Sequence, residues 1–237
     1  MMAPVIKKIF WLTFFSIAMG YMESAVVVYL REIYYPNGFQ FPLVIIPPGI
    51  GLTEIFREAA TVIMLVGIAV LTGKTASQKF AYFLFCFAIW DIFYYIFLKI
   101  LIGWPESLFT WDILFLIPLP WVGPVIAPCF VLLVMILLAG SIEYFHEKGI
   151  NTKISRKEWM LFIMGSIVVI ISFVWDYFHF ISQSKVAAAD SIQPESNHIF
   201  YEISTYVPES FNWGIFLAGE VIIILGLWNF IRRMRMS

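Results

Sequence analysis

The chain is poor in charged residues, which soluble proteins need on their surfaces. Only 13% of its 237 residues are charged, whereas 61% are hydrophobic and 19% are aromatic, and the mean hydropathy is +0.87. This composition excludes an ordinary soluble domain and indicates an integral membrane protein. The net charge is −1 and the basic residues are dispersed among short segments, so nothing points to nucleic acid as a partner.

Histidine and cysteine are also scarce, with three and two residues respectively. A haem held by two histidines, or a zinc ion held by three, needs several histidines at one depth. His179 is the only histidine predicted in the outer half of a membrane span, so both sites are excluded. Cys86 and Cys129 lie within predicted spans and are expected to pack as small apolar residues, so no disulfide is predicted.

Several motifs that identify enzyme families are missing. The sequence contains no P-loop, no dinucleotide-binding glycine fingerprint, no GxSxG and no HExxH. Its last apolar run also lacks the buried lysine to which a rhodopsin-type retinal would be attached. The function must therefore be sought in the distribution of individual side chains.

Long apolar runs are what the chain has in abundance. A run of about twenty residues crosses a hydrocarbon core about 30 Å thick, and six such runs are present: 9–30, 53–72, 80–101, 122–144, 158–181 and 212–231. The first run could be a signal peptide, but it continues to Leu30 and is expected to be a retained helix. The predicted fold is an all-α, polytopic membrane helix bundle that forms one transmembrane domain over residues 1–237.

Basic residues are distributed unequally between the two sides of this bundle. Eleven fall on the side of the termini: Lys7, Lys8, Lys74, Lys79, Lys148, Lys153, Arg156, Lys157, Arg232, Arg233 and Arg235. The opposite side holds only Arg31, Lys99 and Lys185. Because short cytoplasmic segments are enriched in lysine and arginine, both termini are predicted to be cytoplasmic, and the bacterial inner membrane is the expected location.

The connection between the third and fourth spans departs from the pattern of short loops. Gly103-Trp104-Pro105 ends a helix, and the segment 106–117 is too short to cross the membrane. Prolines and glycine at 118, 120, 123 and 124 then interrupt the chain. We predict an interfacial or re-entrant helix on the outer side that carries Trp111 and Asp112, with Asp112 orienting this segment beside a site.

Six acidic side chains lie inside the predicted spans: Glu23, Glu54, Glu58, Asp91, Asp176 and Glu220. Counting about 1.5 Å per helical residue places Glu23, Asp91 and Glu220 about 10–12 Å below the outer interface, with Glu58 and Asp176 slightly shallower, so that all six acids fall in the outer half. Glu54, Arg57, Glu58 and Thr61 recur at the spacing of one helix face. Ionisable groups in membranes normally face a bundle interior and mark functional sites, so we predict a polar pocket that opens outward.

The charges of this pocket do not balance, because six carboxylates meet one certain cation, Arg57, the predicted counter-ion or substrate clamp. Some of the acids must be protonated, the cavity must contain water, or a cation must be bound. Asp176-x-x-His179 places an oxygen and a nitrogen ligand side by side on one helix, as in metal-binding bundles. The leading hypothesis is therefore iron, manganese, zinc or copper held by Asp176, His179, Glu58 and Glu23.

The candidate catalytic set is Glu23, Glu54, Glu58, Asp91 and Glu220. In this hypothesis these acids supply further ligands, hydrogen-bond acceptors for the ligands, or a general base. A second carboxylate–histidine pair, Glu143 and His146, belongs to the opposite end and is expected to be solvated. It is therefore predicted to be too distant to share the metal site.

Three functions fit these features. The favoured one is a membrane-embedded, metal-dependent enzyme acting on a lipid, a quinone or another membrane-soluble substrate. The second is a subunit or assembly partner of a larger membrane complex. The third is a proton- or cation-coupled transporter or channel, which is weakened because the inner halves of the spans show no matching chain of ionisable residues.

Overall fold

The computed structural model describes residues 4–44, 46–115, 120–188 and 205–236. Within these residues lie six long helices and a pair of strands: α1 (Pro4–Tyr34), α2 (Pro48–Thr72), α3 (Ala76–Ile102), β1 (Trp111–Phe115), β2 (Trp121–Pro124), α4 (Ile126–Glu147), α5 (Arg156–Ala188) and α7 (Trp213–Arg235). Each of the six helices is long and apolar enough to cross a membrane. The prediction of a mainly helical, multi-pass membrane protein is confirmed by the number, length and composition of these helices.

Local sequence signals set the helix ends. Thr75 precedes α3, and its side chain accepts a hydrogen bond from the Gln78 amide at 3.2 Å. Gly103 ends α3 at a φ of 71°, a left-handed conformation that glycine adopts without steric cost. Ser155 and Glu158 form reciprocal hydrogen bonds at the start of α5, the arrangement known as a capping box.

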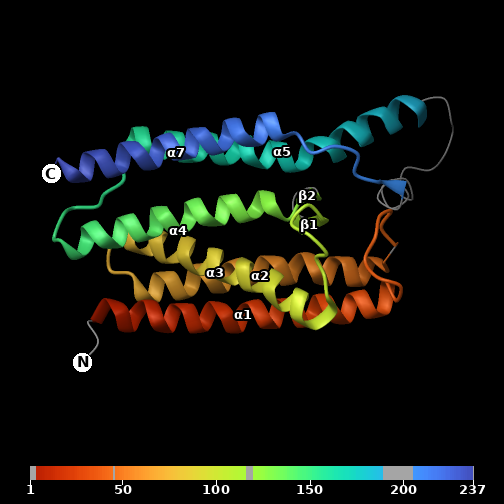
Figure 1. Ribbon diagram of the computed structural model, residues 1–237, viewed down its shortest axis with the longest axis horizontal. Helices are drawn as coiled ribbons and strands as arrows, with labels where there is room; N and C mark the ends of the chain where they lie inside the picture. The colour runs from red at the N-terminus through yellow and green to blue at the C-terminus, as the bar shows by residue number, and fades with distance from the viewer. Residues whose placement is uncertain (1–3, 45, 116–119, 189–204, 237) are drawn as a thin grey trace.

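The helices form one bundle whose two ends differ (Figure 1). The N and C termini lie at the same end, named the terminal end, and the two strands lie toward the other, named the hairpin end. α3 packs against α1, α2 and α4, whereas α5 packs mainly against α7. α4 contacts both α3 and α7 and so links the two groups of helices.

Glycines allow two of these helix pairs to approach closely. A Cβ atom added to Gly20 on α1 would lie 2.8 Å from the Trp90 carbonyl oxygen on α3. On the other side of the bundle, a Cβ atom on Gly219 of α7 would lie 2.7 Å from the Val169 side chain on α5. Small residues of this kind let membrane helices gain van der Waals contact where water supplies no driving force.

The connection after α3 is a β-hairpin, and the prediction of a helix there is wrong. β1 and β2 are antiparallel, with Asp112 opposite Gly123 and Phe115 opposite Trp121. The run Trp111–Phe115 is rich in aromatic and branched residues, and the following prolines and glycine favour a turn over a helix. The bundle is therefore not purely helical, and its fourth helix begins at Ile126 rather than at 122 because 121–124 form β2.

The hairpin lies inside the bundle, between the α3 side and the α5 side. Phe115 of β1 stacks on Phe87 of α3, with ring centroids 6.2 Å apart. Trp121 of β2 stacks on Phe173 of α5 at 6.4 Å and an interplanar angle of 14°. Strand pairing satisfies many of the backbone amides and carbonyls, and the flanking helices shield them, which is the condition for irregular backbone inside a membrane protein.

Candidate functional site

A small cavity lies where α1, α2, α3 and β1 meet. Its volume is about 80 Å³, which is room for a few water molecules. It is lined by Glu23, Val27, Arg57, Glu58, Thr61, Trp90, Asp91, Tyr94, Ile113, Leu114 and Phe115. Three of the six predicted acids therefore face one space, together with the single predicted cation of the spans.

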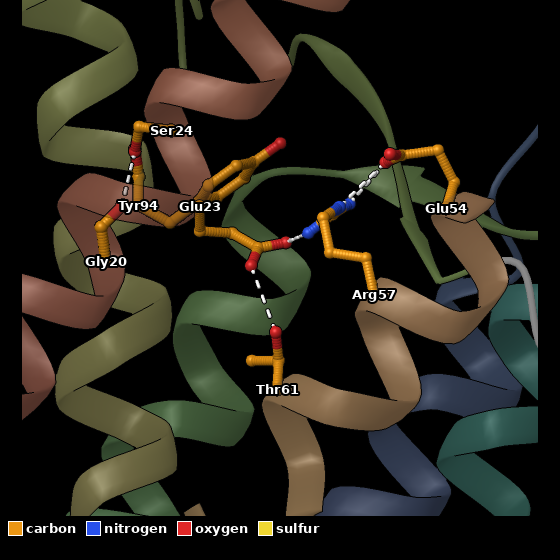
Figure 2. A network of polar contacts seen from close by, with 7 residues as sticks. All are labelled: Gly20, Glu23, Ser24, Glu54, Arg57, Thr61 and Tyr94. Atoms are coloured by element: carbon orange, nitrogen blue, oxygen red, sulfur yellow. Dashed lines mark hydrogen bonds and ion pairs between the residues drawn. The ribbon is translucent and has the colours of Figure 1, made fainter. Parts of the chain in front are cut away.

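Arg57 organises two of the acids around it (Figure 2). Its guanidinium group forms an ion pair with Glu23 of α1 and donates to Glu54, one turn back on α2, with Nε to Oε2 at 2.8 Å. The Thr61 hydroxyl donates to the other Glu23 oxygen at 3.3 Å. Glu54 and Glu23 are largely buried, so Arg57 serves as their shared counter-ion and ties α1 to α2.

Asp91 is the acid of the cavity that lacks a counter-ion. It is partly buried on α3 and makes no hydrogen bond or ion pair with any other residue in the described part of the chain. Trp90 lies beside it on the same lining, and its buried indole N–H also has no partner there. An acceptor and a donor of this kind, in a cavity large enough for water, form a site that a small polar ligand or water completes.

The hairpin is joined to this region through Asp112. Its carboxylate accepts a hydrogen bond from the Tyr95 hydroxyl at 3.1 Å and lies 3.5 Å from the Arg31 guanidinium nitrogen Nη2. The Arg31 guanidinium lies over the Trp104 ring, 3.8 Å from its centroid. Burial raises the pKa of Asp112 to about 6, although Arg31 and Tyr95 both act to lower it.

The other predicted site residues lie away from this cavity. Asp176 on α5 accepts hydrogen bonds from the Tyr206 hydroxyl at 2.8 Å and from the Glu209 amide at 3.2 Å. His179, one turn further along α5, is exposed. Glu220 on α7 is buried, and its Oε1 atom has no hydrogen-bond partner among the described residues. None of Asp176, His179 and Glu220 lines the cavity.

The predicted metal site is not assembled in the described part of the chain. No group of three or more histidine, cysteine, aspartate and glutamate side chains there could hold a metal ion. Metal binding by Asp176, His179, Glu58 and Glu23 therefore stays a prediction. No family model matches this chain, and no curated protein or solved structure is significantly similar to it.

Some residues of the site and its surroundings were not expected from the sequence. Arg31 was assigned to the membrane surface, but it is 8% exposed and pairs with Asp112. Ile113, Leu114 and Phe115 line the cavity because their segment is a strand within the bundle. The signal that could have revealed them is the short run of aromatic and branched residues bounded by turn-forming prolines.

Glu143 is a further correction, since a solvated position was predicted for it. The side chain is 7% exposed, and its two oxygens accept hydrogen bonds from the Tyr82 hydroxyl at 2.7 Å and from Gln78 Nε2 at 3.3 Å. Its sequence neighbours Glu147 and Lys148 suggested a helix end in water, but α4 packs this face against α3. A buried acid therefore also lies toward the terminal end.

Proposed function

We propose that this protein moves protons, or a small cation, through the membrane, with Asp91 as the exchanging group of the cavity. The observation that carries the proposal is a carboxylate without a counter-ion beside a cavity of about 80 Å³ inside a six-helix membrane bundle. An acid in such a place is compensated by a bound proton or by a cation. Glu58 faces the same cavity and is the second candidate for exchange.

The size of the cavity limits its ligand. Pockets that bind organic ligands usually measure about 300–1,000 Å³, whereas this one measures about 80 Å³. A lipid or quinone head group does not fit, while hydrated protons and small cations do. This observation favours transport over the metal-dependent enzyme that the sequence alone favoured.

Toward the terminal end, where the sequence showed no matching chain of ionisable residues, a buried ionisable pair is present. Tyr82 lies nine positions before Asp91 on α3, about 13 Å along the helix axis, and donates to the buried Glu143. Ser16 of α1 is also fully buried, and its hydroxyl donates to the Leu12 carbonyl at 2.8 Å. Buried polar groups are therefore also present on the terminal side of the cavity, where the apolar residues Leu12, Leu65 and Cys86 pack around them.

We also propose that the terminal end faces the cytoplasm and that the protein resides in a bacterial inner membrane. The support is the excess of lysine and arginine near the helix ends on that side. In this orientation the hairpin is a re-entrant element that enters from the outer side. The cavity then exchanges its ligand with the outer aqueous phase first. A role as a subunit of a larger complex stays a separate prediction.

The test is ion flux in proteoliposomes that contain a pH-sensitive dye. With a potassium diffusion potential imposed, wild-type protein is expected to accelerate acidification over empty vesicles, and Asp91→Asn is expected to lower that rate at least tenfold. Asp176→Asn is the matched control, because it removes an acid that accepts hydrogen bonds outside the cavity.

Parallel vesicles with sodium- or potassium-sensitive dyes distinguish a cation from a proton as the cargo. The proposal fails if wild-type protein conducts none of the three ions. It also fails if Asp91→Asn and Asp176→Asn reduce flux equally, because the effect would then not belong to the cavity.

A further inference from the structure

A second and larger cavity, an apolar groove, lies at the terminal end between α1, α3 and α4. Its volume is about 500 Å³, within the range of pockets that bind organic ligands. It is lined by Val5, Ile9, Ala81, Tyr82, Phe85, Ile136, Ala139, Gly140, Glu143, Tyr144, Glu147 and Lys148. The groove shares no lining residue with the carboxylate cavity, although Tyr82 and Glu143, which lie toward the terminal side of that cavity, are part of the groove's lining.

Most of this groove is apolar. Val5 and Ile9 of α1, Phe85 of α3 and Ile136 of α4 form its walls. Gly140 leaves part of it open, because a Cβ atom added there would meet no other atom within 4 Å. A hydrocarbon chain is the ligand that matches such walls inside a bilayer, where apolar surfaces are covered by acyl chains.

The groove becomes polar where α4 ends. The buried Glu143 is already satisfied by Tyr82 and Gln78, and Lys8 donates to the same Tyr82 hydroxyl at 3.2 Å. Glu147 and Lys148 are exposed on the lining, and the Lys148 ammonium group lies over the ring of Tyr144, another lining residue, 4.3 Å from its centroid. One exposed carboxylate and one exposed ammonium group therefore line the polar end of an apolar groove.

We propose that this groove binds a phospholipid whose head group carries both a phosphate and a primary ammonium group. One acyl chain occupies the apolar part, Lys148 contacts the phosphate, and Glu147 contacts the ammonium group. The mixed charge at the mouth is what selects this lipid: a purely anionic head group would meet Glu147 unfavourably, and a quaternary ammonium would offer Glu147 no N–H donor.

The experiment measures lipid retained by delipidated, purified protein after incubation with phosphatidylethanolamine, phosphatidylglycerol or phosphatidylcholine of identical acyl chains. Native mass spectrometry is expected to show one phosphatidylethanolamine bound, at least tenfold more tightly than either other lipid. Gly140→Phe is expected to abolish this binding by filling the groove. Gly67→Phe on α2, where an added Cβ atom also meets nothing within 4 Å, is the matched control and is expected to retain it.

Two exposed substitutions test the head-group contacts without altering the packed helices. Glu147→Gln is expected to remove the preference over phosphatidylglycerol, and Lys148→Gln is expected to weaken all three lipids. The proposal is overturned if wild-type protein retains no lipid, if it prefers phosphatidylglycerol or phosphatidylcholine, or if Gly140→Phe and Gly67→Phe bind lipid equally.

Discussion

At the scale of single residues, Arg57 has the most consequential contacts, because it neutralises acids on two helices. Its guanidinium group pairs with Glu23 and Glu54, both of which are largely buried. Removing one partner from a buried ion pair leaves an uncompensated charge and typically costs about 3–5 kcal/mol. The same charges can be replaced together by neutral groups at much lower cost.

We therefore expect Arg57→Met to lower the free energy of unfolding by about 3 kcal/mol or more, while the triple variant Glu23→Gln/Glu54→Gln/Arg57→Met recovers most of the loss. Denaturant titration in detergent, followed by tryptophan fluorescence, measures both. Equal destabilisation in the single and triple variants would show that Arg57 acts through packing and not as a counter-ion.

The buried carboxyl group of Asp112 is expected to make the stability of the protein depend on pH. Its pKa in the folded protein is about 6, above its ordinary value of 3.8, because the side chain is buried. Between about pH 4 and 6 the folded state then binds more protons than the unfolded state, so this group's contribution to stability falls as the pH rises through that window. The change is on the order of 1–3 kcal/mol and is complete above about pH 6.

Thermal unfolding at pH 5 and pH 7 tests whether the contribution of Asp112 to stability falls as the pH rises. Wild-type protein is expected to gain stability at pH 5 relative to Asp112→Asn, which cannot titrate at this position. Glu106→Gln is the control, since Glu106 is an exposed acid in the same connection. An Asp112→Asn variant with the full pH dependence of the wild type would disprove the assignment.

At the scale of elements, the close approach of α1 to α3 holds the cavity together. Gly20 faces the Trp90 carbonyl oxygen, and Ser24 on the same face donates to the Gly20 and Tyr94 carbonyls at 2.7 and 3.1 Å. Figure 2 shows the Ser24 hydrogen bonds next to Glu23. Any side chain at position 20 would push the two helices apart and separate Glu23 from the α3 side of the cavity.

Gly20→Ala is expected to destabilise the protein by about 1–3 kcal/mol through overpacking. Gly67→Ala is the matched control, because it gains the same helix propensity, about 1 kcal/mol, at a site where the new Cβ atom meets nothing within 4 Å. Unfolding midpoints of the two variants should therefore shift in opposite directions. An unchanged unfolding midpoint in Gly20→Ala would mean that α1 and α3 can move apart without loss of stability.

At the scale of the whole molecule, the bundle is apolar on the outside and polar at a few internal points. Leu71, Ile100 and Ile63 are 85%, 70% and 69% exposed, which a bilayer tolerates and water would not. The two termini lie at the same end of the bundle (Figure 1). The orientation proposed from the basic residues then predicts which loops are reachable from outside.

Cysteine labelling tests this orientation in a Cys86→Ala/Cys129→Ala background. Ser107→Cys, exposed at the hairpin end, is expected to react with a membrane-impermeant maleimide in intact cells. Asn151→Cys, exposed at the terminal end, is expected to react only after permeabilisation. The reverse pattern would contradict the cytoplasmic assignment of the termini.

The spans and the presence of acids within them could be predicted from the sequence, because membrane insertion depends on the summed hydropathy of about twenty neighbouring residues, a local property. Which acids converge could not be predicted, since six acids at one depth can face different neighbours. Glu23, Glu58 and Asp91 meet because Gly20 and Arg57 bring three helices together. Asp176 and His179 stay outside the cavity, where α5 packs against β2 and α7.

The β-hairpin formed by β1 and β2 also depends on tertiary packing and could not be predicted from the local sequence alone. Its turn-forming residues were visible in the sequence, but a short apolar run can form either a helix or a strand. Packing decided the outcome, because β1 and β2 satisfy each other's backbone groups between α3 and α5. The sequence by itself therefore determined the multi-pass membrane class and the six long apolar helices of the described residues. Only the tertiary structure decided which side chains share a cavity, because that depends on helix rotation and contact.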